Sequence, residues 1–133
     1  MDNLSNLQII QQVYRNFAEG NMQAVLSFFD KQVVWIRPGY PDIPFSGTFT
    51  GVEGLSKMFT VINQTIKVRS FLPQKFFVND DMVTVTGTDT VEVISTGKVY
   101  STEWVQCFTL QNGKIIHVLV YMDTLKIAKA FQT

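Results

Sequence analysis

His117 and Asp123, two ionisable residues near the end of the chain, are the first candidates for acid–base chemistry. His117 is the only histidine, and histidine is the side chain whose ordinary pKa lies closest to physiological pH. Asp123 directly precedes residues 124–131, which are predicted to form a helix, so its carboxylate can accept hydrogen bonds from the free N–H groups there. Such bonds favour the ionised carboxylate and lower its pKa, which disfavours a general acid. Capping is therefore the first interpretation of Asp123.

The sequence offers few other residues for catalysis or metal binding. Cys107 is the only cysteine, so neither an internal disulfide nor a cysteine-rich metal site can form. One histidine and one cysteine do not supply a tight transition-metal site. The sequence contains no glycine-rich phosphate loop and no Ser-His-Asp set. We therefore expect neither a metal nor another cofactor.

Apolar and aromatic residues dominate the composition. Hydrophobic residues make up 46% of the chain and 11 of its residues are Phe, which is more apolar surface than a disordered chain carries. Eleven basic residues balance eleven acidic ones, and no run of either sign predicts binding to nucleic acid or to an anionic membrane. The sequence shows neither a signal peptide nor a stretch of roughly 18 apolar residues. We expect one cytoplasmic domain over residues 1–133.

Helical periodicity marks four segments. Apolar residues at helical spacing predict a helix over residues 3–19, which Gly20 ends, and Asn21 can cap a second, short helix. A third helix is predicted after Gly51. The last covers residues 124–131.

The segments between these helices are predicted to be strands. Residues 37–47 hold three prolines and predict an irregular loop. The expected strands, rich in β-branched and aromatic residues, are 33–36, 48–50, 68–72, 75–78, 82–94, 99–110 and 114–122. Long hairpins with tight turns predict an antiparallel meander. The fold class is therefore α+β, with a curved antiparallel sheet wrapped around the N-terminal helices.

This order of elements resembles the SnoaL-like branch of the nuclear transport factor 2 superfamily, over nearly the whole chain. The local patterns that carry the resemblance are Phe17-Ala18-Glu19-Gly20-Asn21, Pro44-Phe45-Ser46-Gly47-Thr48, Glu103-Trp104-Val105, Phe108-Thr109-Leu110-Gln111-Asn112-Gly113-Lys114-Ile115 and Tyr121-Met122-Asp123-Thr124. The resemblance implies a cystatin-like cone with an apolar pocket between the concave sheet face and the helices. The superfamily holds polyketide cyclases, isomerases, hydrolases, dehydratases and proteins that only bind or dimerise, so the fold does not select a reaction.

The resemblance also implies roles for single positions. SnoaL-type cyclases place an aspartate, said to be a general acid/base, where Asp123 stands. The residues of ketosteroid isomerase are not matched, because rough alignment puts Val13, Ile36 and Val105 at its tyrosine and two aspartates. Limonene epoxide hydrolase needs an Asp-Arg-Asp set in its pocket. The nearest candidates here are Arg37, Asp42 and Asp89, and their spacing in the sequence does not bring them together.

Alternation along the last two long strands predicts which residues face the pocket. With the aromatic residues of the helices and loops, the predicted lining is Tyr14, Phe17, Trp35, Tyr40, Phe45, Phe59, Trp104, Gln106, Phe108, Val118, Val120 and Met122. Gln106 is the polar handle of this set. Such a lining suits an apolar or aromatic ligand better than it suits proton transfer. The same side chains would also fit a filled core, so both interpretations stay open.

Three functional hypotheses follow. The leading one is a small-molecule binding protein of the SnoaL-like type. The alternatives are a cofactor-independent cyclase, isomerase or hydrolase-like enzyme that uses Asp123, and a structural dimerisation module whose cavity is filled. The opposite strand parity predicts an apolar outer face that pairs two copies in a homodimer, formed by Val105, Cys107, Ile115, His117, Leu119 and Tyr121.

Overall fold

The computed structural model describes residues 4–133. The helices are α1 (Asn6–Ala18), α2 (Met22–Ser27), α3 (Gly51–Thr65) and α4 (Thr124–Phe131). The strands are β1 (Phe29–Arg37), β2 (Gly47–Thr50), β3 (Ile66–Asn79), β4 (Met82–Val93), β5 (Val99–Gln111) and β6 (Lys114–Met122). The predicted first residue of the first helix, Asn3, lies outside the described residues, and Leu4 and Ser5 precede α1, so the predicted start is too early. Ser5 caps α1 through a reciprocal pair of hydrogen bonds with Gln8, which satisfies two N–H groups at the helix start.

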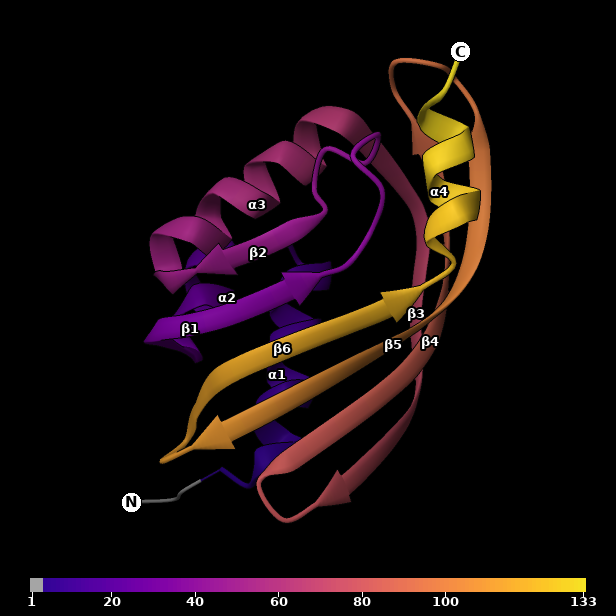
Figure 1. The fold of residues 1–133 in the computed structure, drawn as a ribbon. Coiled ribbons are helices and arrows are strands. Elements are labelled where there is room, and N and C mark those ends of the chain that lie inside the picture. Colours follow the sequence, from indigo (N-terminus) through magenta and orange to yellow (C-terminus); the bar gives the residue numbers. More distant parts are fainter. Residues whose placement is uncertain (1–3) are drawn as a thin grey trace.

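All six strands form one sheet in the order β2-β1-β6-β5-β4-β3. The sheet curves around α1, α2 and α3, and α4 lies at its far end (Figure 1). This arrangement confirms the predicted α+β class with a curved sheet around the N-terminal helices. The pairing is antiparallel except between β1 and β6, which run parallel. Parallel neighbours need a long connection, and most of the chain lies between these two strands.

The two strands predicted at 68–72 and 75–78 are one continuous strand, β3. The register of β3 against β4 shifts between Pro73 and Lys75. Proline has no N–H to donate to a neighbouring strand, so it is tolerated at bulges and at sheet edges. β3 is an edge strand, and Pro73 therefore bends it without ending it.

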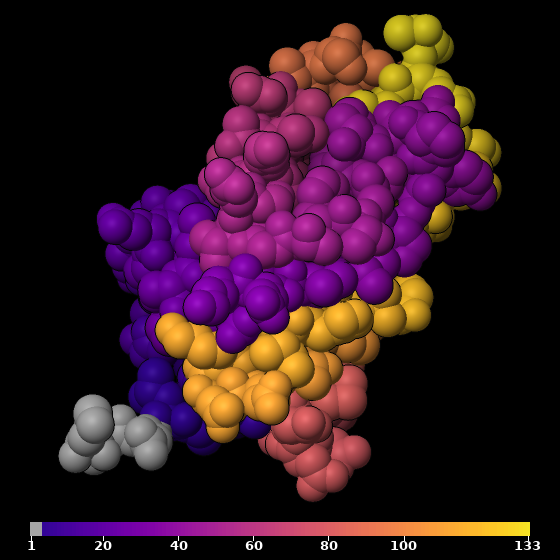
Figure 2. All heavy atoms as spheres, turned by 60° about the vertical axis from the view of Figure 1, so that its left-hand side comes forward, coloured from indigo at the N-terminus to yellow at the C-terminus, as the bar shows by residue number. Residues whose placement is uncertain are grey.

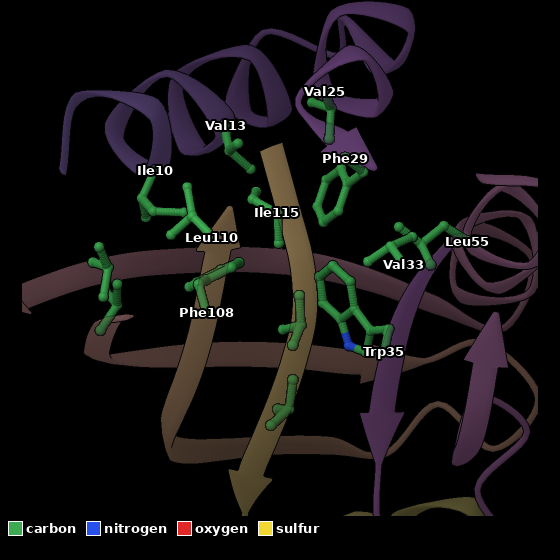
Figure 3. Close-up of a cluster of buried hydrophobic side chains, with 14 of the residues drawn as sticks. Ile10, Val13, Val25, Phe29, Val33, Trp35, Leu55, Phe108, Leu110 and Ile115 are labelled. Atoms are coloured by element: carbon green, nitrogen blue, oxygen red, sulfur yellow. The ribbon is translucent and has the colours of Figure 1, made fainter. Parts of the chain in front are cut away.

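β6 carries a bulge that corrects the predicted outer face. Leu110 pairs with Ile115, whereas Thr109 pairs with His117, so Ile116 is an extra residue on β6. One extra residue reverses the alternation on one side of the bulge. Ile115 is therefore fully buried and packs in the core below α1 (Figure 3), and the prediction that it lies on the outer face is wrong. The outer set becomes Val105, Cys107, His117, Leu119 and Tyr121.

The core consists of two clusters. The larger one fills the space between the helices and the sheet, with Ile10 and Val13 of α1 facing Leu110 and Phe108 (Figure 3). In the smaller one, side chains of the loop after β1 meet those of α4, whose spheres lie side by side at the upper right of Figure 2. Within residues 4–133, no helix combines the length and the apolar character that a membrane span requires.

Candidate ligand pocket

A cavity of about 90 Å³ lies between α1, α3 and the concave face of the sheet. Its wall is mostly apolar and contains eight of the twelve residues predicted to line a pocket. These eight are Tyr14, Phe17, Trp35, Phe45, Phe59, Gln106, Phe108 and Met122. The Trp35 ring lies 5.8 Å from that of Phe59 and 6.4 Å from that of Phe108, so aromatic rings from α3, β1 and β5 meet at one place.

The other four predicted residues lie outside this wall. Tyr40 is exposed on the loop after β1, and Val118 is fully buried in the core. Val120 lies below the same loop, toward α4. Trp104 is fully buried and stacks on Phe71, with 4.8 Å between the ring centroids. Strand alternation identified the face of the sheet but not which side chains border open space.

Tyr14 and Gln106 form a polar pair in the aromatic wall. The Tyr14 hydroxyl donates a hydrogen bond to Oε1 of Gln106 at 2.5 Å. Burial raises the pKa of Tyr14 far above its ordinary value, so the phenol stays neutral and remains a donor. Gln106 therefore lies in the wall with its side-chain oxygen held by α1, and its role toward a ligand stays a prediction.

A second polar group of side chains occupies the other end of the cavity. Arg37, Asp89 and Tyr100 all contribute to the wall. The Asp89 carboxylate accepts a hydrogen bond from the Thr102 hydroxyl at 2.5 Å, and the Arg37 guanidinium lies over the ring of Phe45, 5.4 Å from its centroid. This end of the cavity therefore combines a cation, a carboxyl group and a phenol.

Burial sets the protonation of these groups. It lowers the pKa of Arg37 to about 10, so the guanidinium is still charged at neutral pH. Burial also raises the pKa of Asp89, against the opposing effects of the Thr102 hydrogen bonds and the positive charge of Arg37. The pKa of Tyr100 is raised mainly by burial and also by the neighbouring Asp89 charge. A raised carboxyl pKa brings Asp89 closer to a value at which it can exchange protons.

Arg37 and Asp89 are candidates by residue type, but their spacing in the sequence does not place them together. The signal that could have placed them is alternation: Arg37 follows Val33 and Trp35 at even spacing along β1. Asp89 likewise shares the parity of Val85 and Val91, which are buried on β4. A charged residue at an inward position of a strand is uncommon and marks a site candidate. Asp42, the third candidate for the Asp-Arg-Asp set, is exposed on the loop after β1.

Asp123 and His117 lie outside the cavity wall. Asp123 is exposed and accepts a hydrogen bond from the Lys126 N–H at 3.1 Å, which is the N-cap geometry expected for α4. Its catalytic role stays a prediction. His117 is partly exposed on β6. Across the described residues, no cluster of three or more His, Cys, Asp or Glu side chains could hold a metal ion.

Comparison with known proteins gives one family match. The family model described as SnoaL-like domain matches residues 10–118. No protein with a curated description matches the chain.

Solved structures similar to this chain share its architecture from end to end. An NTF2-like protein from Burkholderia xenovorans LB400 is 26% identical, with a TM-score of 0.88 and 99% of each chain covered. TerC co-crystallised with polyporic acid is 22% identical, with a TM-score of 0.82, covering 96% of this chain and 98% of its own. A protein with a cystatin-like fold from Xanthomonas campestris is 22% identical, with a TM-score of 0.79 over 96% of this chain and 98% of its own.

Proposed function

Because this chain belongs to the family of SnoaL-like domains, we propose that it binds a small apolar or aromatic molecule in the cavity beside Trp35. The observation that carries the proposal is a cavity walled by aromatic rings that still contains polar groups at two ends. Its volume of about 90 Å³ is several times the roughly 10–15 Å³ that a single water molecule needs. TerC, which has been co-crystallised with polyporic acid, supports the proposal by its similar fold.

The size of the cavity limits the ligand. Pockets for drug-sized molecules measure about 300–1,000 Å³, so the cavity as it stands suits a compact molecule with one ring or two fused rings. Several wall residues keep part of their surface exposed, and Val68 is 46% exposed. Phe17, Ile62 and Phe71 are further partly exposed residues of the wall. A larger ligand would enter by displacing these side chains, which lie on α1, α3 and β3.

Calorimetric titration with indole and trans-cinnamamide tests the proposal. We expect one molecule to bind per chain, and we expect Val91→Phe to weaken binding by about tenfold or more, equivalent to about 1.4 kcal/mol, because Val91 lines the cavity. Val78→Phe is the matched control, since Val78 is exposed on β3 and outside the wall. Absence of binding by the wild type, or equal binding by Val91→Phe, would contradict the proposal.

A second candidate function is proton transfer by Asp89. The observation that favours it is a carboxyl group in the cavity wall with a pKa raised by burial. The hypothesis drawn from the family resemblance instead assigns this role to Asp123. Nuclear magnetic resonance in D2O can follow exchange of the acidic C–H protons of phenylacetone, an aryl ketone. If Asp89 acts, Asp89→Asn abolishes protein-dependent exchange and Asp123→Asn retains it; the reverse result would assign the role to Asp123.

We also propose that two copies pair through the outer face of β5 and β6. Tyr121 is 54% exposed there, and Val105 and Leu119 extend the apolar surface along the two paired strands. A specific pair should bury roughly 1,200–2,000 Å² in total. Light scattering should give the mass of two chains for the wild type and of one chain for Leu119→Glu. A wild-type mass of one chain would refute the dimer, and a dimeric variant would refute this face.

A further inference from the structure

We infer that the ligand of this cavity carries an anionic oxygen, as in an aryl carboxylate, and that Arg37 binds this oxygen. The inference rests on the proposed binding function and adds the chemical class of the ligand. Arg37 is the last residue of β1 and shares the inward parity of Val33 and Trp35. Its side chain therefore forms part of the cavity wall and is only partly exposed.

The hydrogen-bond donors of Arg37 are unused within the described protein. A guanidinium offers five N–H donors, yet the Arg37 side chain forms no hydrogen bond or ion pair with the described residues 4–133. The one ion pair in that part of the chain joins Arg69 to Glu92 on the exposed side of β3 and β4. Asp89 lies in the same wall but is beyond ion-pair distance of Arg37 and is hydrogen-bonded to Thr102.

An unpaired cation in a mostly apolar wall is unfavourable, because partial burial removes some of the water that would solvate it. The ring of Phe45 compensates in part, since a cation over an aromatic face is attracted to it. That contact uses the face of the guanidinium and leaves its N–H edge available. An anionic oxygen at this edge would form charge-assisted hydrogen bonds, the strongest of the ordinary kinds.

Trp35 provides a second, independent indication of an oxygen-bearing ligand. Its Nε1–H is buried and has no acceptor among the described residues. Figure 3 shows this nitrogen on the edge of the ring that faces away from Phe29. Trp35 and Arg37 are two positions apart on one strand, so their side chains leave the same face about 6–7 Å apart. Both offer donors and neither offers an acceptor.

Asp89 limits the affinity of this end for an anion. An ionised Asp89 would repel a ligand carboxylate across the wall, whereas a neutral side chain there would not. The charge of Arg37 and the space between aromatic rings together favour a molecule with one flat apolar ring and one acidic group. Substituting Asp89 by asparagine should therefore strengthen the binding of an anion.

Trans-cinnamate and trans-cinnamamide provide the test, because they have nearly the same shape and differ in charge. At neutral pH we expect the wild type to bind cinnamate about tenfold more tightly than cinnamamide, the size expected for a charge-assisted hydrogen bond. Arg37→Met should abolish this preference by weakening the binding of cinnamate more than that of cinnamamide, whose carbonyl oxygen can also accept a hydrogen bond from Arg37. Arg37→Lys, which keeps the charge, should retain part of the preference, and Asp89→Asn should increase it. Arg69→Met removes an exposed arginine and serves as the control.

The outcomes separate this inference from the proposed function. Equal binding of the two compounds by the wild type would overturn the anion inference while leaving a neutral-ligand pocket intact. A preference for cinnamate that persists in Arg37→Met and in Arg37→Lys would show that another group recognises the charge, which also overturns it. Failure of both compounds, together with indole, to bind at all would overturn the proposed function itself. A preference lost in Arg37→Met but kept in Arg69→Met supports the inference.

Discussion

The regions around Trp35 and Trp104 differ in packing, although both hold a buried tryptophan. Both side chains are buried, and both indole N–H groups lack a partner within the described residues. Trp35 borders the cavity, whereas Trp104 stacks nearly parallel on Phe71, at an interplanar angle of 7°, with its other edge at Gly87. Alternation along a strand therefore decides whether a side chain points into the protein or out of it. The size of the neighbouring side chains decides whether a cavity remains beside it.

The largest effect that would test this contrast is expected at Trp104. Trp104→Ala should lower the free energy of unfolding by about 3–5 kcal/mol, because it removes a large, fully enclosed side chain. Urea unfolding measures the loss. A decrease below about 1 kcal/mol would show that the ring is not closely packed.

Substitution of Gly87 tests the same packing from the opposite side. A Cβ added at Gly87 would collide with the Trp104 ring and lie 2.5 Å from the Leu72 carbonyl oxygen. We expect Gly87→Ala to cost about 1–3 kcal/mol, as overpacking does. Gly54→Ala is the control, because the nearest atom to its new Cβ is 3.5 Å away and alanine favours a helix. A similar decrease in the free energy of unfolding in the two variants would show that close packing at Gly87 is not the cause.

The end of the cavity that holds Arg37 and Asp89 is charged, whereas the surroundings of Trp104 are apolar. Because burial raises the pKa of Asp89, the folded state binds the Asp89 proton more tightly than the unfolded state does. This contribution makes the protein less stable as pH rises from about 3.9, the ordinary aspartate value, through the raised value, by about 1.4 kcal/mol per unit of increase in pKa. Asp89→Asn should remove this pH dependence. Parallel stability curves for the two proteins would contradict the assigned protonation.

A smaller effect is expected at Asp123, outside both regions. Asp123→Ala should cost about 1 kcal/mol, since an N-cap hydrogen bond is lost. Asp123→Asn should be nearly neutral because asparagine caps almost as well. Thermal unfolding of the two variants distinguishes them. An Asn variant as unstable as the Ala variant would show that the charge of Asp123, and not its cap, stabilises α4.

Much of the fold could be predicted from local pattern. Asn21 caps α2 and Asp123 caps α4, as expected. What escaped prediction depends on pairing between strands that are distant in sequence. The bulge at Ile116 and the continuous path of β3 through Pro73 are set by register against the neighbouring strand, which no local pattern specifies.

The candidate site was predictable only in part, for a related reason. Phe17, Trp35 and Phe108 were placed in the wall by periodicity, because amphipathic elements turn their apolar residues inward. The juxtaposition of Arg37 with Asp89 depends on curvature of the whole sheet, since β1 and β4 are not neighbours in it. Alternation in the sequence predicts that both side chains face inward, but it does not predict that they lie close together.

The indole N–H signals of the two tryptophans offer the most direct test of the central claim, that the space beside Trp35 binds a small aromatic molecule. The chain has only two tryptophans, so a nitrogen–proton correlation spectrum contains two such signals, and Trp35→Phe assigns them. Titration with trans-cinnamamide should shift the Trp35 signal in a saturable way and leave the Trp104 signal almost unchanged. Saturable binding that shifts Trp104 but not Trp35, or no shift of either signal, would contradict the claim.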